Sequence, residues 1–307
     1  MRFRVLIRGI LGLNFLLPLV SALPAQDATQ QDTPQQAQES PARSQVEQIA
    51  RQNGADMALA FRSLDGSQEL YIQADKQFRA PSTVAKLPIM IELYAEAQAG
   101  ELRLSDTITV HNGFVSPLGG ETFQLDPRSD PDPDFYKSIG TAVTLGDLCD
   151  HMSKKDSDLA ADLLIEKLGL DRIRQRIHAL HVDGLELRRG FGETTVAPNA
   201  PANTTSARAL MELLWVMANG QVINSDVSQQ MIGIIANSDA GGANAGLPSD
   251  ARTAHMSANV TGIQHEELIV YGAHSFVEVV IVPNSTSPDA TAGLMALVTH
   301  ALAAGLQ

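Results

Sequence analysis

The sequence is poor in cysteine, tryptophan and aromatic residues in general, which make up 5% of its 307 residues. Cys149 is the only cysteine, so an internal disulfide and a metal cluster of several cysteines are both excluded. The sequence contains no G-x-G-x-x-G or Walker loop, and its eight histidines show neither an H-E-x-x-H motif nor a paired metal-ligand spacing. We therefore expect neither a metal nor a cofactor.

Basic residues are also scarce, since 22 Lys and Arg stand against 35 Asp and Glu. The formal charge is −13, and removing Arg2, Arg4 and Arg8 would leave −16. Such an acidic chain repels phosphate backbones, so we expect no nucleic-acid partner. With 44% hydrophobic and 19% charged residues, the composition is that of a globular protein and excludes a fibrous or wholly disordered one.

The N-terminus combines three arginines with an apolar run over residues 9–20. The run has about 12 apolar residues, with Pro18 inside it, whereas a membrane-spanning helix needs roughly 20. Small residues follow, and cleavage after Ala22 or Ala25 fits a secretory signal. We predict a signal peptide over residues 1–25, export to the periplasm or the exterior, and no stable membrane span after cleavage. An N-terminal membrane anchor is the alternative.

Residues 26–43 hold six Gln, two Pro and no large apolar side chain. Such a segment cannot offset the entropy lost on ordering, so we predict a disordered linker. The sequence Ser44-Gln-Val-Glu47 fits a capping box that begins a helix. The folded domain is therefore predicted to span residues 44–307.

Two strand-like runs, 57–61 and 70–72, flank an Asp65-Gly66 turn and predict a β-hairpin. Two further strands are predicted at 267–271 and 275–282. Apolar residues recur at helical spacing in seven segments: 84–99, 144–153, 157–168, 171–180, 205–218, 226–237 and 287–304. Short turns between strands predict an antiparallel sheet, and helices grouped apart from it predict an α+β fold.

The segment Ser82-Thr83-Val84-Ala85-Lys86 resembles the S-x-x-K nucleophile motif of class A serine β-lactamases and penicillin-binding proteins. The resemblance extends over residues 44–307 and includes Asn203-Thr-Thr-Ser206 and Ile269-Val270-Tyr271. It implies a class A β-lactamase-like α+β fold, with an antiparallel sheet flanked by helices and an inserted all-helical lobe. The sheet lobe would comprise about 44–80 and 220–307, and the helical lobe about 81–219. It also implies a small-molecule or peptidoglycan-like ligand.

The first motif departs from the family spacing by one residue. A lysine one helical turn after a serine can take its proton, but Lys86 lies four residues after Ser82 and three after Thr83. Either Ser82 or Thr83 could therefore be the nucleophile, with Lys86 as its base. Alternatively, Ser82 only caps a helix and Lys86 is solvated.

The second family motif, S-D-N, falls on Asp156-Ser157-Asp158 when it is placed from the following helix. Asp156 then replaces the serine that relays a proton, and Asp158 replaces the asparagine. A carboxylate beside Lys86 favours the charged lysine and weakens it as a base. A shift of one residue gives Ser157-Asp158-Leu159 and makes Ser157 a catalytic candidate. Alternatively, the aspartates only stabilise a helix N-terminus.

The third family motif, K-T-G, falls on Met256-Ser257-Ala258. Met256 carries no charge to attract a substrate carboxylate, and Ala258 adds a side chain where the family keeps clearance. Ser257 alone keeps a hydroxyl. The deacylating glutamate of the family is expected at Gly190, with Glu193 nearby but displaced.

Two functions are consistent with these motifs. The first is an exported class A β-lactamase-like protein with eroded motifs, weak or no β-lactam hydrolysis, and a binding or scaffolding role. The alternative is an active serine hydrolase that works through an acyl-enzyme, with Ser82 or Thr83, Lys86 and Ser157 as catalytic candidates. Asp158 and Ser257 are the candidates for substrate binding.

Overall fold

The computed structural model describes residues 41–80, 82–116, 119–192, 199, 201–236, 242–260 and 262–306. The predicted signal peptide and the predicted linker up to residue 40 lie outside the described residues. The first helix, α1 (Pro41–Gln52), begins before the predicted capping box, so that prediction and the end of the linker at residue 43 are wrong. Pro41 explains the earlier start, because proline is favoured in the first turn of a helix, where its missing N–H costs nothing.

The centre of the fold is a five-stranded sheet with the order β2-β1-β11-β10-β9. All four pairings are antiparallel. The strands are β1 (Ala58–Ser63), β2 (Glu69–Ile72), β9 (Arg252–Val260), β10 (Ile263–Tyr271) and β11 (Phe276–Val282). The predicted hairpin and the two predicted C-terminal strands are thus confirmed. The edge strand β9 carries the residues of the third motif.

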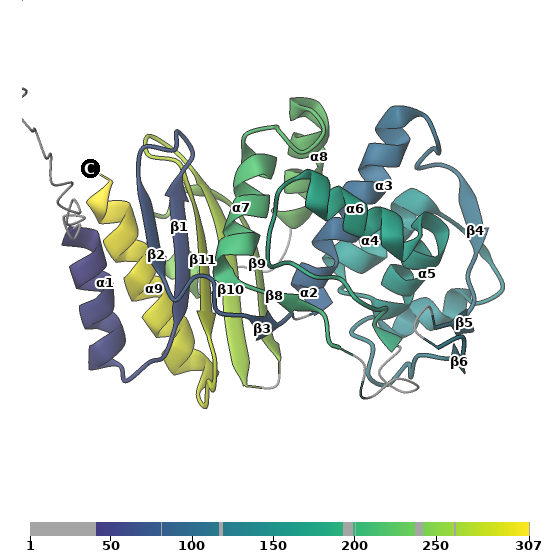
Figure 1. The fold of residues 1–307 in the computed structure, drawn as a ribbon, viewed down its shortest axis with the longest axis horizontal. Helices are drawn as coiled ribbons and strands as arrows, with labels where there is room; N and C mark the ends of the chain where they lie inside the picture. Colours follow the sequence, from purple (N-terminus) through teal and green to yellow (C-terminus); the bar gives the residue numbers. More distant parts are fainter. Residues whose placement is uncertain are drawn as a thin grey trace, which may run out of the picture. The chain divides into compact units, whose positions relative to one another are not determined.

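Helices cover both faces of the sheet (Figure 1). On one face, α9 (Pro288–Gly305) and α1 pack on a cluster that includes Leu59 and Phe61. On the other face, α7 (Ala207–Ala218) packs against β1 and β11. The predicted lobe boundary at 219 placed α7 with the helical lobe, but these contacts place it on the sheet as well. Because the central strands are covered on both faces, every residue of β11 is buried.

The remaining helices form the lobe beside β9: α2 (Ser82–Ala85), α3 (Leu87–Ala99), α4 (Leu145–Lys154), α5 (Asp158–Leu168), α6 (Leu170–Ala179) and α8 (Ser225–Ile235). Three short antiparallel pairs and two 3-10 helices complete the described elements: β3 (Phe78–Arg79) with β8 (Thr204–Thr205), β4 (Thr107–Thr109) with β7 (Ala142–Thr144), β5 (Phe114–Val115) with β6 (Thr122–Phe123), η1 (Pro133–Ser138) and η3 (Ala243–Gly246). The predicted α+β architecture is confirmed.

The helix predicted over 84–99 is divided at Lys86 into α2 and α3. Pro88, in the first turn of α3, has no N–H to continue the hydrogen bonds of α2, which accounts for the division. At its other end α3 stops at Gly100, which is in the left-handed conformation at φ 75°. No helix in the described ranges is both long and apolar enough to cross a membrane.

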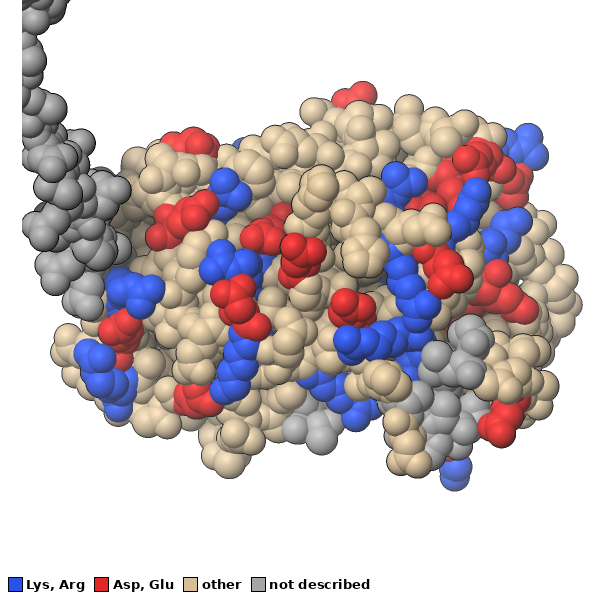
Figure 2. Space-filling model, in the orientation of Figure 1, with Lys and Arg blue, Asp and Glu red and all other residues tan. Residues whose placement is uncertain are grey.

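Charged residues of both signs are interspersed over the face shown in Figure 2. Many basic side chains are paired with a carboxylate, as in Arg208–Asp75 at 2.6 Å and Arg62–Glu69 at 2.9 Å. Surface pairs of this kind contribute little to stability, but they neutralise much of the positive charge that a polyanion would need.

Candidate functional site

Lys86 is buried at the junction of α2 and α3, with 2% of its surface exposed. Its Nζ atom lies 2.6 Å from the backbone oxygen of Asp156 and 2.7 Å from Oδ1 of the same residue. Asp158 Oδ1 is 2.8 Å from the same nitrogen. Two of the three N–H donors of the ammonium are thus used by Asp156, and Asp158 forms an ion pair with the same nitrogen. The alternative in which Lys86 is solvated is therefore wrong.

Asp156 reaches Lys86 with both its backbone and its side chain because of its conformation. Its φ of 56° is in the left-handed region, which aspartate tolerates better than most residues. The second carboxylate oxygen, Oδ2, accepts a hydrogen bond of 3.3 Å from Thr83 Oγ1. Asp156 thus links two of the predicted site residues, Thr83 and Lys86.

Ser157 lies between the two aspartates but has a different environment. It is fully buried and is the N-cap residue of α5, where its hydroxyl accepts a hydrogen bond of 3.3 Å from the Ala160 N–H. Replacing such a cap typically costs about 1 kcal/mol. Asp156 and Asp158 therefore contact Lys86, whereas the Ser157 hydroxyl caps the N-terminus of α5.

The start of α5 is also held by Asp130, which the sequence analysis did not single out as a functional residue. Its Oδ2 accepts hydrogen bonds from the Leu159 N–H at 2.9 Å and from the Tyr136 hydroxyl at 2.9 Å. Its Oδ1 accepts from the Asp158 N–H at 3.3 Å. A carboxylate at a helix N-terminus is stabilised by the helix dipole, so Asp130 fixes the turn that presents the two aspartates to Lys86.

Burial has a direct electrostatic consequence for Asp158. Desolvation raises the pKa of its carboxyl, and the nearby Lys86 ammonium opposes this shift only in part. Asp156 and Asp130, both acidic, raise the pKa further. The site thus contains more carboxylates than the single lysine neutralises.

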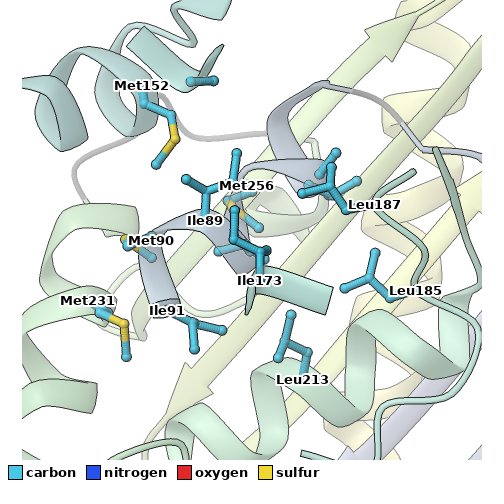
Figure 3. Close-up of a cluster of buried hydrophobic side chains, with 14 of the residues drawn as sticks. Ile89, Met90, Ile91, Met152, Ile173, Leu185, Leu187, Leu213, Met231 and Met256 are labelled. Carbon is cyan, nitrogen blue, oxygen red and sulfur yellow. The ribbon is translucent and has the colours of Figure 1, made fainter. Parts of the chain in front are cut away.

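A cavity of about 140 Å³ lies beside Lys86. Its lining comes from α2, α3, α4, α8 and β9: Thr83, Lys86, Leu87, Met90, Met152, Ser153, Ile235, Met256 and Ser257. Ser257 is exposed, whereas Met90, Met152 and Met256 are buried. Figure 3 shows these three methionines within one cluster of buried side chains. Thr83, Lys86 and Ser257, predicted from motifs far apart in the sequence, therefore meet around one cavity.

Two predicted residues are only partly described. Ser82 is the first residue of α2, but its side chain lies outside the described part of the chain. Glu193 also lies outside it. The nucleophilic role of Ser82 therefore stays a prediction.

Gly190, where the resemblance places the deacylating glutamate, has no room for a side chain. A Cβ atom added there would lie 2.7 Å from Asp162 Oδ1. Asp162 is itself held in place, because its carboxylate accepts hydrogen bonds from the N–H groups of Phe191 at 2.7 Å and Gly192 at 3.0 Å. The sequence offers one signal for Asp162, a carboxylate within the apolar pattern of α5.

Neither a metal site nor a reactive thiol competes with this cavity in the described residues. Within the described ranges, no group of three His, Cys, Asp or Glu is arranged to hold a metal ion. Cys149 is buried, and burial raises the pKa of its thiol to about 12, which suppresses the reactive thiolate. The cavity beside Lys86 remains the candidate site.

The comparisons with known proteins agree with this architecture. The model of the β-lactamase enzyme family matches residues 41–305. The β-lactamase from Sphaerobacter thermophilus is 20% identical, with a TM-score of 0.69 over 86% of this chain and 97% of that one. An ancestral class A β-lactamase is 20% identical, with a TM-score of 0.71 over 86% and 99%.

A structure of PBP-A is 17% identical, with a TM-score of 0.68 over 84% of this chain and 94% of that one. No curated protein matches the sequence. At these identities the solved structures establish the fold, which is the predicted class A β-lactamase-like one. The family match begins where the described part of the chain begins and ends one residue before its last residue, Leu306. The chain therefore belongs to the β-lactamase enzyme family.

Proposed function

We propose that this protein is an exported, β-lactamase-like binding protein that does not turn over β-lactams. Export rests on the signal-like N-terminus. The loss of turnover rests on one observation above all, the enclosure of Lys86 by three acceptors from Asp156 and Asp158.

A lysine that activates a hydroxyl must offer a lone pair to the proton it removes. The Lys86 ammonium donates to the backbone oxygen and to Oδ1 of Asp156 and forms an ion pair with Asp158 Oδ1 at 2.8 Å, and giving up a proton would weaken these contacts. General acid–base catalysis typically contributes about 10²–10⁴-fold, so a lysine held as a cation removes a large part of the rate.

The residues around Lys86 also disfavour the binding of an anionic substrate. The resemblance places the carboxylate-binding lysine at Met256, an uncharged residue on the cavity wall. The nearby cation, Lys86, already faces the carboxylates of Asp156 and Asp158. Among the described residues that line the cavity, a substrate carboxylate would meet like charges and no free counterion, which disfavours its binding.

Deacylation would fail for a separate reason. An acyl-enzyme of this family needs a general base near Gly190, but Asp162 occupies the space next to that position. The Asp162 carboxylate is engaged by two backbone N–H groups, which hold it in the loop. Any acyl-enzyme that formed would therefore be long-lived.

A second function is favoured by the hydrogen bond between Thr83 and Asp156. A hydroxyl bonded to a carboxylate is the arrangement of a nucleophile with a general base, and Thr83 occupies the nucleophile position when the motif is aligned from Lys86. The alternative is thus a hydrolase that forms an acyl-enzyme at Thr83 or Ser82, on an ester or amide substrate without a carboxylate.

Mass spectrometry of the full chain after incubation with benzylpenicillin and, separately, with a fluorophosphonate distinguishes the two. We expect the unmodified mass with both reagents. A fluorophosphonate adduct that disappears in Thr83→Ala or Ser82→Ala would support the hydrolase. A stable penicillin adduct would show acylation without deacylation, and the loss of turnover would then lie in deacylation alone.

A further inference from the structure

We propose that the cavity beside Lys86 binds a small, uncharged aromatic molecule or a single aromatic ring of a larger ligand. This inference rests on the proposed function, because it assigns a ligand class to the same cavity. The size of the cavity, the chemistry of its wall and the charges behind that wall all favour such a ligand.

The size suits one ring. The cavity has a volume of about 140 Å³. An apolar cavity of about 150 Å³ in another protein holds benzene, so a six-membered ring is the right scale for this one.

The wall is mostly apolar and rich in sulfur. Five of its side chains are apolar, Leu87, Met90, Met152, Ile235 and Met256, and three of these are methionines. The methionines come from three elements, α3, α4 and β9 (Figure 3). Thioethers are polarisable, make favourable contacts with aromatic rings and adapt to the shape of a ligand.

Three of the four polar side chains on the wall, all but the exposed Ser257, are engaged by the protein itself. Thr83 Oγ1 donates to Asp156 Oδ2 at 3.3 Å, and Ser153 Oγ donates to Met90 Sδ at 3.8 Å. The Lys86 ammonium is neutralised by two carboxylates. An ion entering this cavity would therefore lose its hydration without gaining a counterion, whereas an uncharged ring would not.

A matched series of probes with the same ring tests the proposal: benzyl alcohol, benzylamine and benzoate. Titrations of the full chain would be followed by NMR of its ¹³C-labelled methionine methyl groups. We expect benzyl alcohol to shift the methyls of Met90, Met152 and Met256 saturably. The methyls of Met57 and Met295, which lie in the cluster on the other face of the sheet, should not shift. The two charged probes should bind at least about tenfold more weakly.

Two variants of strand β9 locate the site. Ser257→Phe places a ring at the exposed side of the cavity and should abolish the shifts. Arg252→Phe adds the same ring at an exposed position of the same strand and should leave them unchanged. Unaltered Met57 and Met295 signals would show that both variants fold; if Ser257→Phe does not fold, the wild-type titration decides alone.

Three results would overturn the proposal: no saturable shift with benzyl alcohol, binding of benzoate or benzylamine as tight as that of the alcohol, or full binding by a folded Ser257→Phe variant. Each of these outcomes leaves the loss of β-lactam turnover intact. Conversely, hydrolysis of a β-lactam would refute the proposed function, whatever the probes do.

Discussion

Replacing Lys86 with methionine should destabilise the protein strongly, because it removes the shared partner of two carboxylates. Methionine has a similar length and volume and can occupy the same buried space, so the change is mainly one of charge. Asp156 and Asp158 would then face one another without a cation. A large loss of stability would show that Lys86 has a structural role and not only a catalytic one.

The magnitude follows from the burial of the three side chains. Breaking a buried ion pair from one side costs about 3–5 kcal/mol. The Lys86 side chain is 3% exposed, but those of Asp156 and Asp158 are 30% and 23% exposed and can regain part of their hydration. We therefore expect a loss of about 3 kcal/mol, which corresponds to a decrease in Tm of roughly 6–12 °C for a domain of this size.

Thermal and urea unfolding at pH 7, followed by circular dichroism, would measure this loss. Lys154→Met is the matched control, because Lys154 pairs with Asp150 on the surface, with the two side chains 40% and 50% exposed. The control should change stability by at most about 0.5 kcal/mol. The double variant Lys86→Met/Asp158→Asn should recover part of the loss. Equal effects of Lys86→Met and Lys154→Met would refute the reasoning.

Three further changes test other parts of the structure. Glu278 is buried, which raises the pKa of its carboxyl to about 8, so the folded protein keeps a proton that the unfolded chain loses above about pH 4.5. The contribution of Glu278 to stability should therefore fall as pH rises from about 4.5 to 8. Glu278→Gln should remove this contribution and stabilise the protein by about 3 kcal/mol at pH 7 in urea unfolding. Gly190→Glu would restore the deacylating acid of the family, but its side chain would clash with Asp162 and should destabilise the protein by about 2 kcal/mol. Gly233→Glu is the control, because Gly233 has open space around it, and it should not destabilise the protein. Thermal melts would compare the two variants. Asp130→Ala should cost about 1–2 kcal/mol in the same melts because it leaves the N–H groups at the start of α5 without their carboxylate; no change would contradict its role.

Much of the fold followed from local patterns in the sequence. The hairpin of β1 and β2 was predictable because Asp65-Gly66 separates two short apolar runs, and the end of α3 because Gly100 can adopt a positive φ. Strand β9 has no such signal. It is the edge of the sheet and combines exposed and buried residues without a regular apolar alternation, so local patterns in the sequence do not predict it.

The site was predictable to the extent that its residues follow motifs. Counting from the helix that became α5 placed Asp156 and Asp158 at the second motif, and both lie against Lys86. The backbone oxygen of Asp156 could not be foreseen, because its contact depends on a left-handed conformation at that residue. Nor could the roles of Met90 and Met152, since a methionine that lines a cavity and one that fills a core follow the same apolar spacing.

If Lys86 no longer serves as a base, the protein should not hydrolyse β-lactams. The most direct measurement is the hydrolysis of a chromogenic cephalosporin by the purified full chain, with Ser82→Ala and Thr83→Ala as controls for a contaminating enzyme. We predict a rate equal to that of the buffer for the wild type and both variants. Turnover by the wild type that is lost in either variant would contradict the account.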